Sequence, residues 1–267
     1  MSATSSALQM LRRQLAQSQP HNPGREIVST GLPSLDALLP HAGLPSGSLI
    51  EWISDGPGNR ASSVAFRCAA GFLGRPGAFA VVDGRGCFNP AAVRNTGIPV
   101  SRLLVVRPQT DRPGRHRFHS DNAGSYSQRQ QHQRTETLWA LEQLGRSSGV
   151  QVVVTWIDRL SSTAQRRLQL AVETSGVTVF LIRPAAALHQ TSWADLRFHV
   201  QSAQTAESVV SVGETARHRS RIAVRLIRSK NAVQHNGCAL LECHDETGDV
   251  LEVPELARPA NTTGTAC

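Results

Sequence analysis

The sequence contains very little lysine. Lys230 is the only lysine among 267 residues, and arginine supplies the rest of the 28 basic side chains. Any mechanism that needs a lysine elsewhere is therefore excluded, including the phosphate-loop chemistry that depends on one. With 20 acidic residues the net charge is +8, which favours a polyanionic partner such as nucleic acid.

Long hydrophobic runs are also absent. No stretch approaches the roughly 18 consecutive apolar residues of a membrane helix. Residues 1–20 contain no apolar run followed by a small-residue cleavage site. We therefore expect a cytoplasmic protein that is neither secreted nor inserted in a membrane. The five cysteines are odd in number and scattered, which argues against a disulfide framework.

Short β-branched or aromatic runs alternate with helical patterns through most of the chain. The expected strands cover residues 48–53, 78–83, 102–106, 150–157 and 177–182. The expected helices cover residues 62–72, 90–95, 135–147 and 162–174. This alternation predicts an α/β fold with a mainly parallel central sheet flanked by helices. Later in the chain strands predominate, and we expect C-terminal antiparallel strands at residues 196–202, 221–227 and 239–243.

The ends of the chain and one internal segment differ from this core in composition. We expect residues 1–24 to form an amphipathic helix and a linker, with an apolar face made by Leu8, Leu11 and Leu15. That face is a candidate partner-binding element, and packing on the protein's own core is the alternative. The main domain covers residues 25–256, with a basic insertion at 107–134 that we expect to be disordered. Residues 257–267 form a polar tail.

The loop after the first core strand lies where a parallel α/β sheet would bind a phosphate. Glycine-rich loops at this position bring backbone N–H groups together at a helix N-terminus. The segment here is Ser54-Asp55-Gly56-Pro57-Gly58-Asn59-Arg60-Ala61, which matches the phosphate-loop pattern at no defining position. We interpret it as a vestigial phosphate loop formed by Gly56, Gly58, Asn59 and Arg60. We expect no cofactor, and weak ATP binding at this loop is the alternative.

Several blocks of the sequence resemble the RecA recombinase superfamily. They are residues 29–36, 43–51, 81–83 followed by Asn89-Pro90, and 150–157. Within that superfamily the chain is most similar to the ImuA family, the RecA-like accessory proteins of bacterial mutagenesis cassettes. The residues that carry this similarity are 138–143, Trp156, 166–171 and 180–184.

The resemblance implies a RecA-like core in which the catalytic positions are substituted. The lysine and hydroxyl positions of the phosphate loop fall on Arg60 and Ala61, the catalytic glutamate on Arg85, and the magnesium-organising aspartate on Trp156. Arginine lacks the compact ammonium of lysine, and alanine has no hydroxyl for magnesium. An arginine is no general base, and an indole offers one N–H and no metal ligand. The resemblance therefore implies a pseudo-ATPase with no catalytic residues.

The ImuA resemblance also implies a function in the SOS response to DNA damage, in DNA repair by error-prone translesion synthesis and in mutagenesis. The implied partners are ImuB, an inactive Y-family polymerase homologue, the RecA recombinase and an error-prone C-family DNA polymerase. Single-stranded DNA is a further candidate partner. Two alternatives stay open: an active recombinase-like ATPase that binds single-stranded DNA, and a SulA-type inhibitor of cell division.

The strongest electrostatic feature is a basic stretch late in the chain. Its candidate DNA-binding residues are Arg217, Arg219, Arg221, Arg225, Arg228 and Lys230. A solvated surface is the alternative interpretation. In a regular strand Arg221 and Arg225 face one way and Arg228 the other. Aromatic residues make up only 4% of the chain and are absent from this stretch, so contact with DNA phosphates is expected in preference to base stacking.

Two further groups of residues receive structural interpretations. His235, Cys238, Cys243 and His244 are the side-chain types of a zinc site. A strand over residues 238–244, however, points Cys243 away from Cys238 and His244, so we predict a hairpin at Asn236-Gly237 and no metal. Trp139 shares a helix face with Leu138 and Leu141, and we expect it to pack in the core, with a partner-binding anchor as the alternative.

Overall fold

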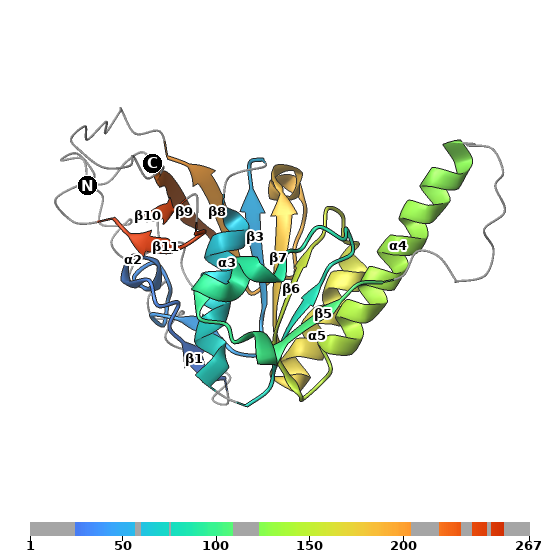
Figure 1. Cartoon of the computed structure of the whole chain (residues 1–267), viewed down its shortest axis with the longest axis horizontal. Helices are drawn as coiled ribbons and strands as arrows, with labels where there is room; N and C mark the ends of the chain where they lie inside the picture. Colours follow the sequence, from blue (N-terminus) through green and yellow to red (C-terminus); the bar gives the residue numbers. More distant parts are fainter. Residues whose placement is uncertain are drawn as a thin grey trace, which may run out of the picture.

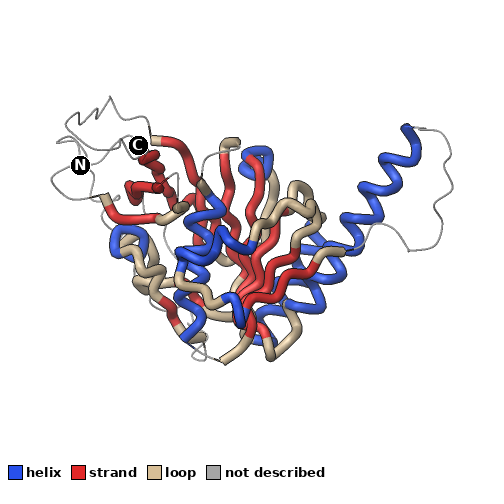
Figure 2. Tube along the Cα trace, in the orientation of Figure 1, coloured by secondary structure: helices blue, strands red, loops and turns tan. Residues whose placement is uncertain are grey.

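The computed structural model describes residues 25–56, 60–74, 76–108, 123–203, 219–230, 237–244 and 247–253. The strands of its main sheet are β3 (Leu49–Ser54), β4 (Ala78–Val82), β5 (Leu103–Val106), β6 (Val150–Trp156), β7 (Thr178–Pro184), β8 (Leu196–Ser202), β9 (Arg219–Ser229), β10 (Cys238–His244) and β11 (Val250–Glu252). They lie in the order β11-β10-β9-β8-β3-β7-β6-β4-β5, as one twisted sheet (Figure 2).

The predicted fold class is confirmed by the pairing of these strands. The strands from β8 to β5 in the sheet order pair in parallel, and β9, β10 and β11 continue the sheet in antiparallel fashion. The fold is therefore an α/β fold with a mainly parallel sheet and C-terminal antiparallel strands. A separate short ladder pairs β1 (Ile27–Val28) with β2 (Leu44–Pro45).

Helices cover both faces of the sheet, which explains why its central strands are apolar on both sides. On one face α3 (Ala61–Ala70) packs on a core that includes Trp52 of β3. On the other face α4 (Ala123–Leu144) and α5 (Ser162–Ser175) pack on a second core that includes Leu49 of β3 (Figure 1). The remaining short helices are α2 (Pro33–Asp36), η1 (Gly71–Gly74), η2 (Pro90–Thr96), η3 (Val100–Arg102) and η4 (Ala185–His189).

The helix α4 starts earlier than the sequence pattern predicts. It begins at Ala123 and not at Thr135, so residues 123–134 of the predicted insertion are helical. Its first turns extend beyond the sheet (Figure 1), and they are rich in glutamine and arginine, which favour helix without an apolar stripe. No helix of the described residues is long and apolar enough to span a membrane.

The interpretation of Trp139 as a core residue is wrong. Its residue surface is 61% exposed, whereas Leu141 on the same helix is fully buried. The two residues differ because α4 crosses the sheet edge with only one face against the core, and Trp139 lies on the outer side. The alternative interpretation, a partner-binding anchor, is compatible with this exposure.

The strand β9 contains a bulge that changes which residues share a face. Opposite β8, Leu226 pairs with Phe198 and Arg228 pairs with Arg197, so that Ile227 is the extra residue. Directly opposed residues of an antiparallel pair point to the same face. Arg228 therefore lies on the face of Arg197, which is also the face of Arg225, and the predicted regular alternation at Arg228 is wrong.

The strands β9 and β10 form the antiparallel pair that the sequence predicts. Cys243 is buried in the core on the α3 face, as its strand position requires. No group of three or more metal-ligating side chains is found within the described ranges. Several sequence predictions lie outside those ranges, namely Leu8, Leu11, Leu15, Gly58, Asn59, Arg217, His235, Asn236 and the tail 257–267.

Candidate functional site

The positions that the RecA resemblance assigns to catalysis meet at one edge of the sheet. The parallel strands β3, β4 and β6 all end there, and the loops that follow carry Asp55, Arg85 and Asp158. In open α/β sheets ligands bind at this carboxyl edge. The strand, loop and helix that would hold a phosphate are present, since β3 ends at Ser54 and α3 begins at Ala61.

The first RecA-like block folds into a loop that supports α3. Asp36 accepts hydrogen bonds from the Ser29 hydroxyl (2.6 Å) and from the Thr30 backbone N–H (2.9 Å). The Gly31 carbonyl accepts a hydrogen bond from Arg67 of α3 (3.0 Å). Gly31 has φ +71°, and a Cβ there would lie 2.6 Å from the Arg67 guanidinium. The positive φ favours glycine at this position, whereas the Arg67 guanidinium is the end of a flexible side chain that could move aside.

The vestigial phosphate loop carries a fixed negative charge. Asp55 accepts hydrogen bonds from His199 and from Gln201 (2.9 Å), which project from β8. Burial alone would raise the pKa of Asp55, but the hydrogen bonds from His199 and Gln201 outweigh it and lower the pKa. An ionised carboxylate next to the loop repels a phosphate. Arg60, at the lysine position, caps α3 in the left-handed region with φ +55°.

The indole of Trp156 covers the start of α3. Its Nε1 donates a hydrogen bond to the hydroxyl of Ser62 (3.0 Å), the second residue of that helix. Its ring centroid lies 5.9 Å from those of Phe66 and Phe88. An aromatic cluster thus lies at the helix N-terminus, where a nucleotide phosphate would otherwise bind backbone N–H groups.

Asp83 organises the loop that follows β4. Its side chain is 1% exposed and accepts hydrogen bonds from the backbone N–H groups of Cys87 and Phe88 and from Arg107, each 3.0 Å long. Burial alone would raise the pKa of Asp83, but these hydrogen bonds, first that of Phe88, lower it overall. The aspartate of the RecA-like block is therefore a structural residue that shapes the loop carrying Arg85.

Arg85 is engaged by an acidic partner across the edge. Its guanidinium pairs with the carboxylate of Asp158, which follows β6. Both side chains are about half exposed, 52% and 50%. The position of the catalytic glutamate thus holds a cation already neutralised by its neighbour.

A cavity of about 210 Å³ opens beside this ion pair. Its lining includes Arg85, Trp156, Arg134 and Arg159. Arg134 and Arg159 are exposed, and neither makes an ion pair or side-chain hydrogen bond with the described residues. The cavity is therefore cationic, and it suits an anionic group better than a metal ion. The sequence analysis missed both arginines, because Arg134 falls in the segment expected to be disordered and Arg159 follows a strand without any motif.

A buried cluster of ion pairs joins β3 to its two neighbouring strands, β7 and β8. Glu51 of β3 forms ion pairs of 2.7 Å with Arg183 of β7 and with Arg197 of β8. Their side chains are 0%, 0% and 8% exposed, respectively. The guanidinium of Arg183 also donates to Gln190, and that of Arg197 to the carbonyl of Ala187. No sequence motif predicts this cluster, since its members lie far apart in the chain.

The arginines of the basic stretch fall on one face of β9. Arg221 forms an ion pair with Glu242 of β10 (3.1 Å). The side chain of Arg225 makes no hydrogen bond or ion pair with the described residues, and its Nε is buried. Arg228 is exposed and donates to the carbonyl of Ser192. The backbone of Arg219 begins the strand, so the structure aligns at least Arg221, Arg225 and Arg228.

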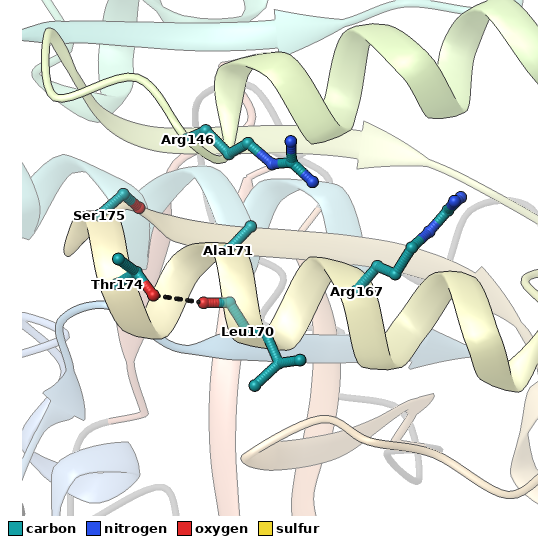
Figure 3. A pocket seen from close by; sticks show the side chains of 6 residues that line it. All are labelled: Arg146, Arg167, Leu170, Ala171, Thr174 and Ser175. Carbon is teal, nitrogen blue, oxygen red and sulfur yellow. Dashed lines mark hydrogen bonds between the residues drawn. The ribbon is translucent and has the colours of Figure 1, made fainter.

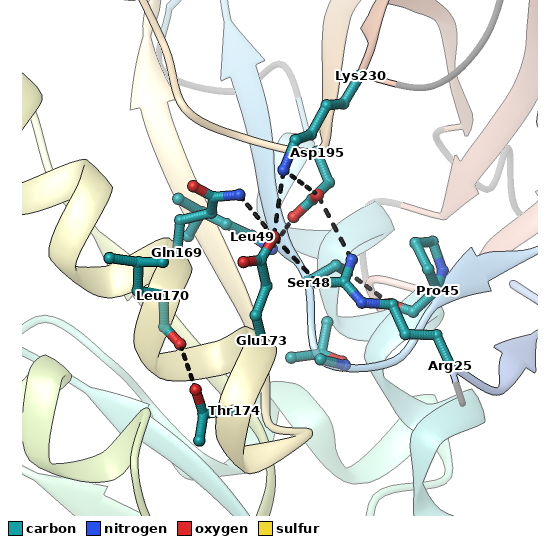
Figure 4. A network of polar contacts seen from close by, with 12 residues as sticks. Arg25, Pro45, Ser48, Leu49, Gln169, Leu170, Glu173, Thr174, Asp195 and Lys230 are labelled. Carbon is teal, nitrogen blue, oxygen red and sulfur yellow. Dashed lines mark hydrogen bonds and ion pairs between the residues drawn. The ribbon is translucent and has the colours of Figure 1, made fainter. Parts of the chain in front are cut away.

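Lys230 has other neighbours than this arginine face. Its ammonium lies 3.1 Å from Glu173 and 3.8 Å from Asp195. Arg25 joins the same two carboxylates, at 3.3 and 3.5 Å (Figure 4). Asp195 also accepts a hydrogen bond from the backbone N–H of Leu49 (2.9 Å). The single lysine is thus part of a network at the amino end of β3, opposite the candidate site.

Comparison with known proteins finds similarity to RecA. The chain is 34% identical to the RecA protein of Allorhizobium ampelinum over 85 residues, and 33% identical to that of Acidiphilium cryptum over 85 residues. It is 29% identical to the RecA protein of Clostridium botulinum over 89 residues. Together with the parallel sheet, this similarity supports a RecA-like core. About a third of the chain is similar to RecA proteins.

The similarity is partial. The matched residues are 32–33% of this chain and 23–25% of the RecA proteins, so the match spans about a quarter of the length of those relatives. No family model matches the chain. The comparison therefore shows a partial similarity to RecA, and it carries no activity of RecA with it.

Proposed function

We propose that this RecA-like chain is a non-catalytic accessory protein of the ImuA type, which supports error-prone translesion synthesis in the SOS response. In this proposal it acts in the cytoplasm by binding, and its partners are ImuB, the RecA recombinase and an error-prone C-family DNA polymerase. Single-stranded DNA is a further proposed ligand. The superfamily similarity supports the RecA-like core, and the ImuA-like blocks of the sequence favour this role within it.

One observation carries the non-catalytic part of the proposal. The hydrogen bond from Trp156 to Ser62 places an indole on the first turn of α3, where a nucleotide-binding protein of this fold holds phosphate. The ion pair between Arg85 and Asp158 and the negative charge of Asp55 also count against a nucleotide phosphate at this edge. Arg60, Ala61 and Arg85, which the resemblance assigns to the lysine, hydroxyl and glutamate positions, supply neither an ammonium, a hydroxyl nor a general base for phosphoryl transfer.

ATP turnover tests this part. We expect the purified full chain to hydrolyse no more ATP than buffer does, with or without single-stranded DNA, while RecA measured in parallel is active. The variant Arg60→Ala serves as the control for a contaminating ATPase, because the rate of a contaminant does not change with this substitution. Robust turnover that Arg60→Ala abolishes would overturn the proposal in favour of a recombinase-like ATPase.

Complex formation tests the accessory part. We expect the tagged full chain to co-purify with ImuB from the same genome, and ATP or ADP to leave the amount of complex unchanged. If the predicted apolar face of Leu8, Leu11 and Leu15 contributes to ImuB binding, deletion of residues 1–20 lowers the amount of complex. Absence of any complex, combined with cell filamentation on overexpression, would favour the SulA-type alternative.

A further inference from the structure

The helical layer formed by α4 and α5 exposes large apolar side chains. Among the described residues six large hydrophobic side chains are more than a third exposed, and three of them, Trp139, Leu170 and Trp193, belong to this layer. Trp193 contacts α5 directly, since its Nε1 donates to Ser162 (2.9 Å) and Arg166 lies over its ring at 4.7 Å. Such a gathering of exposed apolar surface is typical of a protein interaction site.

A groove lies between the end of α4 and the second half of α5. Its volume is about 470 Å³, and it is lined by Arg146, Arg167, Leu170, Ala171, Thr174 and Ser175. Figure 3 shows Arg146 above Ala171, Arg167 farther along α5 with its guanidinium directed away from Ala171, and the Leu170 side chain on the other side of the helix in this view. Leu170 is 46% exposed. Trp139 lies on α4, which ends two residues before Arg146.

The charge of the groove is positive and only partly neutralised. Arg167 donates to Glu142 of α4 (2.7 Å), which closes one end with an ion pair. Arg146 is exposed and makes no side-chain hydrogen bond or ion pair within the described part of the chain. An occupant with a carboxylate opposite Arg146 and an apolar side chain on Leu170 would complement both features.

We propose that this groove docks an acidic segment of a partner protein, in which a large aliphatic or aromatic side chain stands close to carboxylates. Arginine and tryptophan are enriched where protein interfaces derive most of their binding energy. A DNA strand fits less well, because Leu170 would meet sugar and phosphate instead of an apolar group. The proposal is independent of the ATPase question and of the partner names given above.

Selection from a library of displayed 12-residue peptides tests the proposal without a known partner. We expect peptides enriched on the full chain to contain two or more acidic residues and at least one large apolar residue. As synthetic labelled peptides they should bind Leu170→Asp and Arg146→Glu at least about 10-fold more weakly than the parent protein. Leu251→Asp and Arg94→Glu are the matched controls, because Leu251 is also half exposed and the exposed Arg94 likewise makes no side-chain hydrogen bond or ion pair with any residue that the structure describes.

Several outcomes would overturn the proposal. Enriched peptides that are basic or neutral, equal binding by the groove variants and the controls, or no enrichment at all would each do so. Single-stranded DNA that binds the parent and loses affinity with Arg146→Glu but not with Arg94→Glu would assign the groove to nucleic acid. If none of the selected peptides is acidic and a synthetic peptide of residues 1–24 displaces them, the groove would be assigned to the chain's own N-terminal segment.

Discussion

The Nε1 of Trp156 lies 3.0 Å from the hydroxyl oxygen of Ser62, and this hydrogen bond joins the end of β6 to the first turn of α3. The bond crosses the place where a nucleotide phosphate would bind. The same indole packs against Phe66 and Phe88. Trp156, at a position that the RecA resemblance assigns to catalysis, is therefore part of the packing of this edge.

The stability of this edge should depend on the Trp156 ring more than on its hydrogen bond. We expect Trp156→Ala to lower the free energy of unfolding by roughly 2–4 kcal/mol, because it leaves a cavity beside two phenylalanines. Trp156→Phe keeps an aromatic ring and should cost only about 1 kcal/mol for the lost bond. Urea denaturation of both variants measures the difference. Equal losses would show that the hydrogen bond, and not the packing, is decisive.

The buried ion cluster should be sensitive to the loss of its one carboxylate. Glu51→Gln leaves the guanidinium groups of Arg183 and Arg197 buried without a counter-charge, and we expect a loss of about 3–5 kcal/mol. The matched control is Glu142→Gln, which breaks the exposed pair with Arg167 and should cost under about 1 kcal/mol. Thermal and urea unfolding check both values, and similar losses in the two variants would contradict the expectation.

The stability of the protein should depend on pH through Asp83. Its pKa is lowered below the ordinary 3.8, so its ionised form is favoured in the folded state. The stabilisation by ionised Asp83 is fully present above the pKa that Asp83 has in the unfolded chain. It is lost as the pH falls through the lower pKa that Asp83 has in the folded protein. We expect Asp83→Asn to destabilise the protein at neutral pH, because Cys87 and Phe88 donate to different oxygens of Asp83, and the NH₂ that replaces one of them cannot accept a hydrogen bond.

The deficit of Asp83→Asn relative to the parent should shrink as the pH falls below about 3.8. Urea titrations of both proteins between about pH 7 and pH 2.5 measure it. A deficit that stays constant over this range would mean that the carboxylate charge plays no part.

Any affinity for single-stranded DNA should reside in the arginines of β9 and not in Lys230. Arg225→Gln and Arg228→Gln should each weaken binding and reduce the slope of log K against log salt by about 0.7. Lys230→Gln should leave that slope unchanged while lowering stability, since its ammonium is held by Glu173 and Asp195. Fluorescence anisotropy at several salt concentrations distinguishes these results. A smaller slope in Lys230→Gln would place the lysine in the DNA contact.

Local patterns in the sequence were sufficient for much of the architecture. The strands β3, β4, β6 and β7 were predicted within two residues at each end, because they are buried on both faces and read as short apolar runs. The start of α4 was missed, since its first turns are polar and carry no apolar periodicity. Trp139 was misplaced because helix spacing shows which residues share a face, and gives no measure of how much of that face the sheet covers.

The candidate site was predictable in part. The substitutions at Arg60, Ala61, Arg85 and Trp156 are visible in the chain itself, as is the absence of lysine from the phosphate loop. The contacts that now occupy the edge are not visible there, because the partners of Trp156 and Arg85 come from other loops and helices. Residues that are distant in sequence carry no local signature of being neighbours.

The sequence by itself determined the order of strands and helices and the mismatch of residues 54–61 to the phosphate-loop pattern, since both depend on residue type and short-range spacing. Tertiary structure alone decided three other features: the pairing of Glu51 with two arginines, the alignment of Arg228 with Arg225 through a bulge, and the engagement of Lys230 in an ion network. Each depends on the register between strands, and that register is set by the packing of the whole sheet.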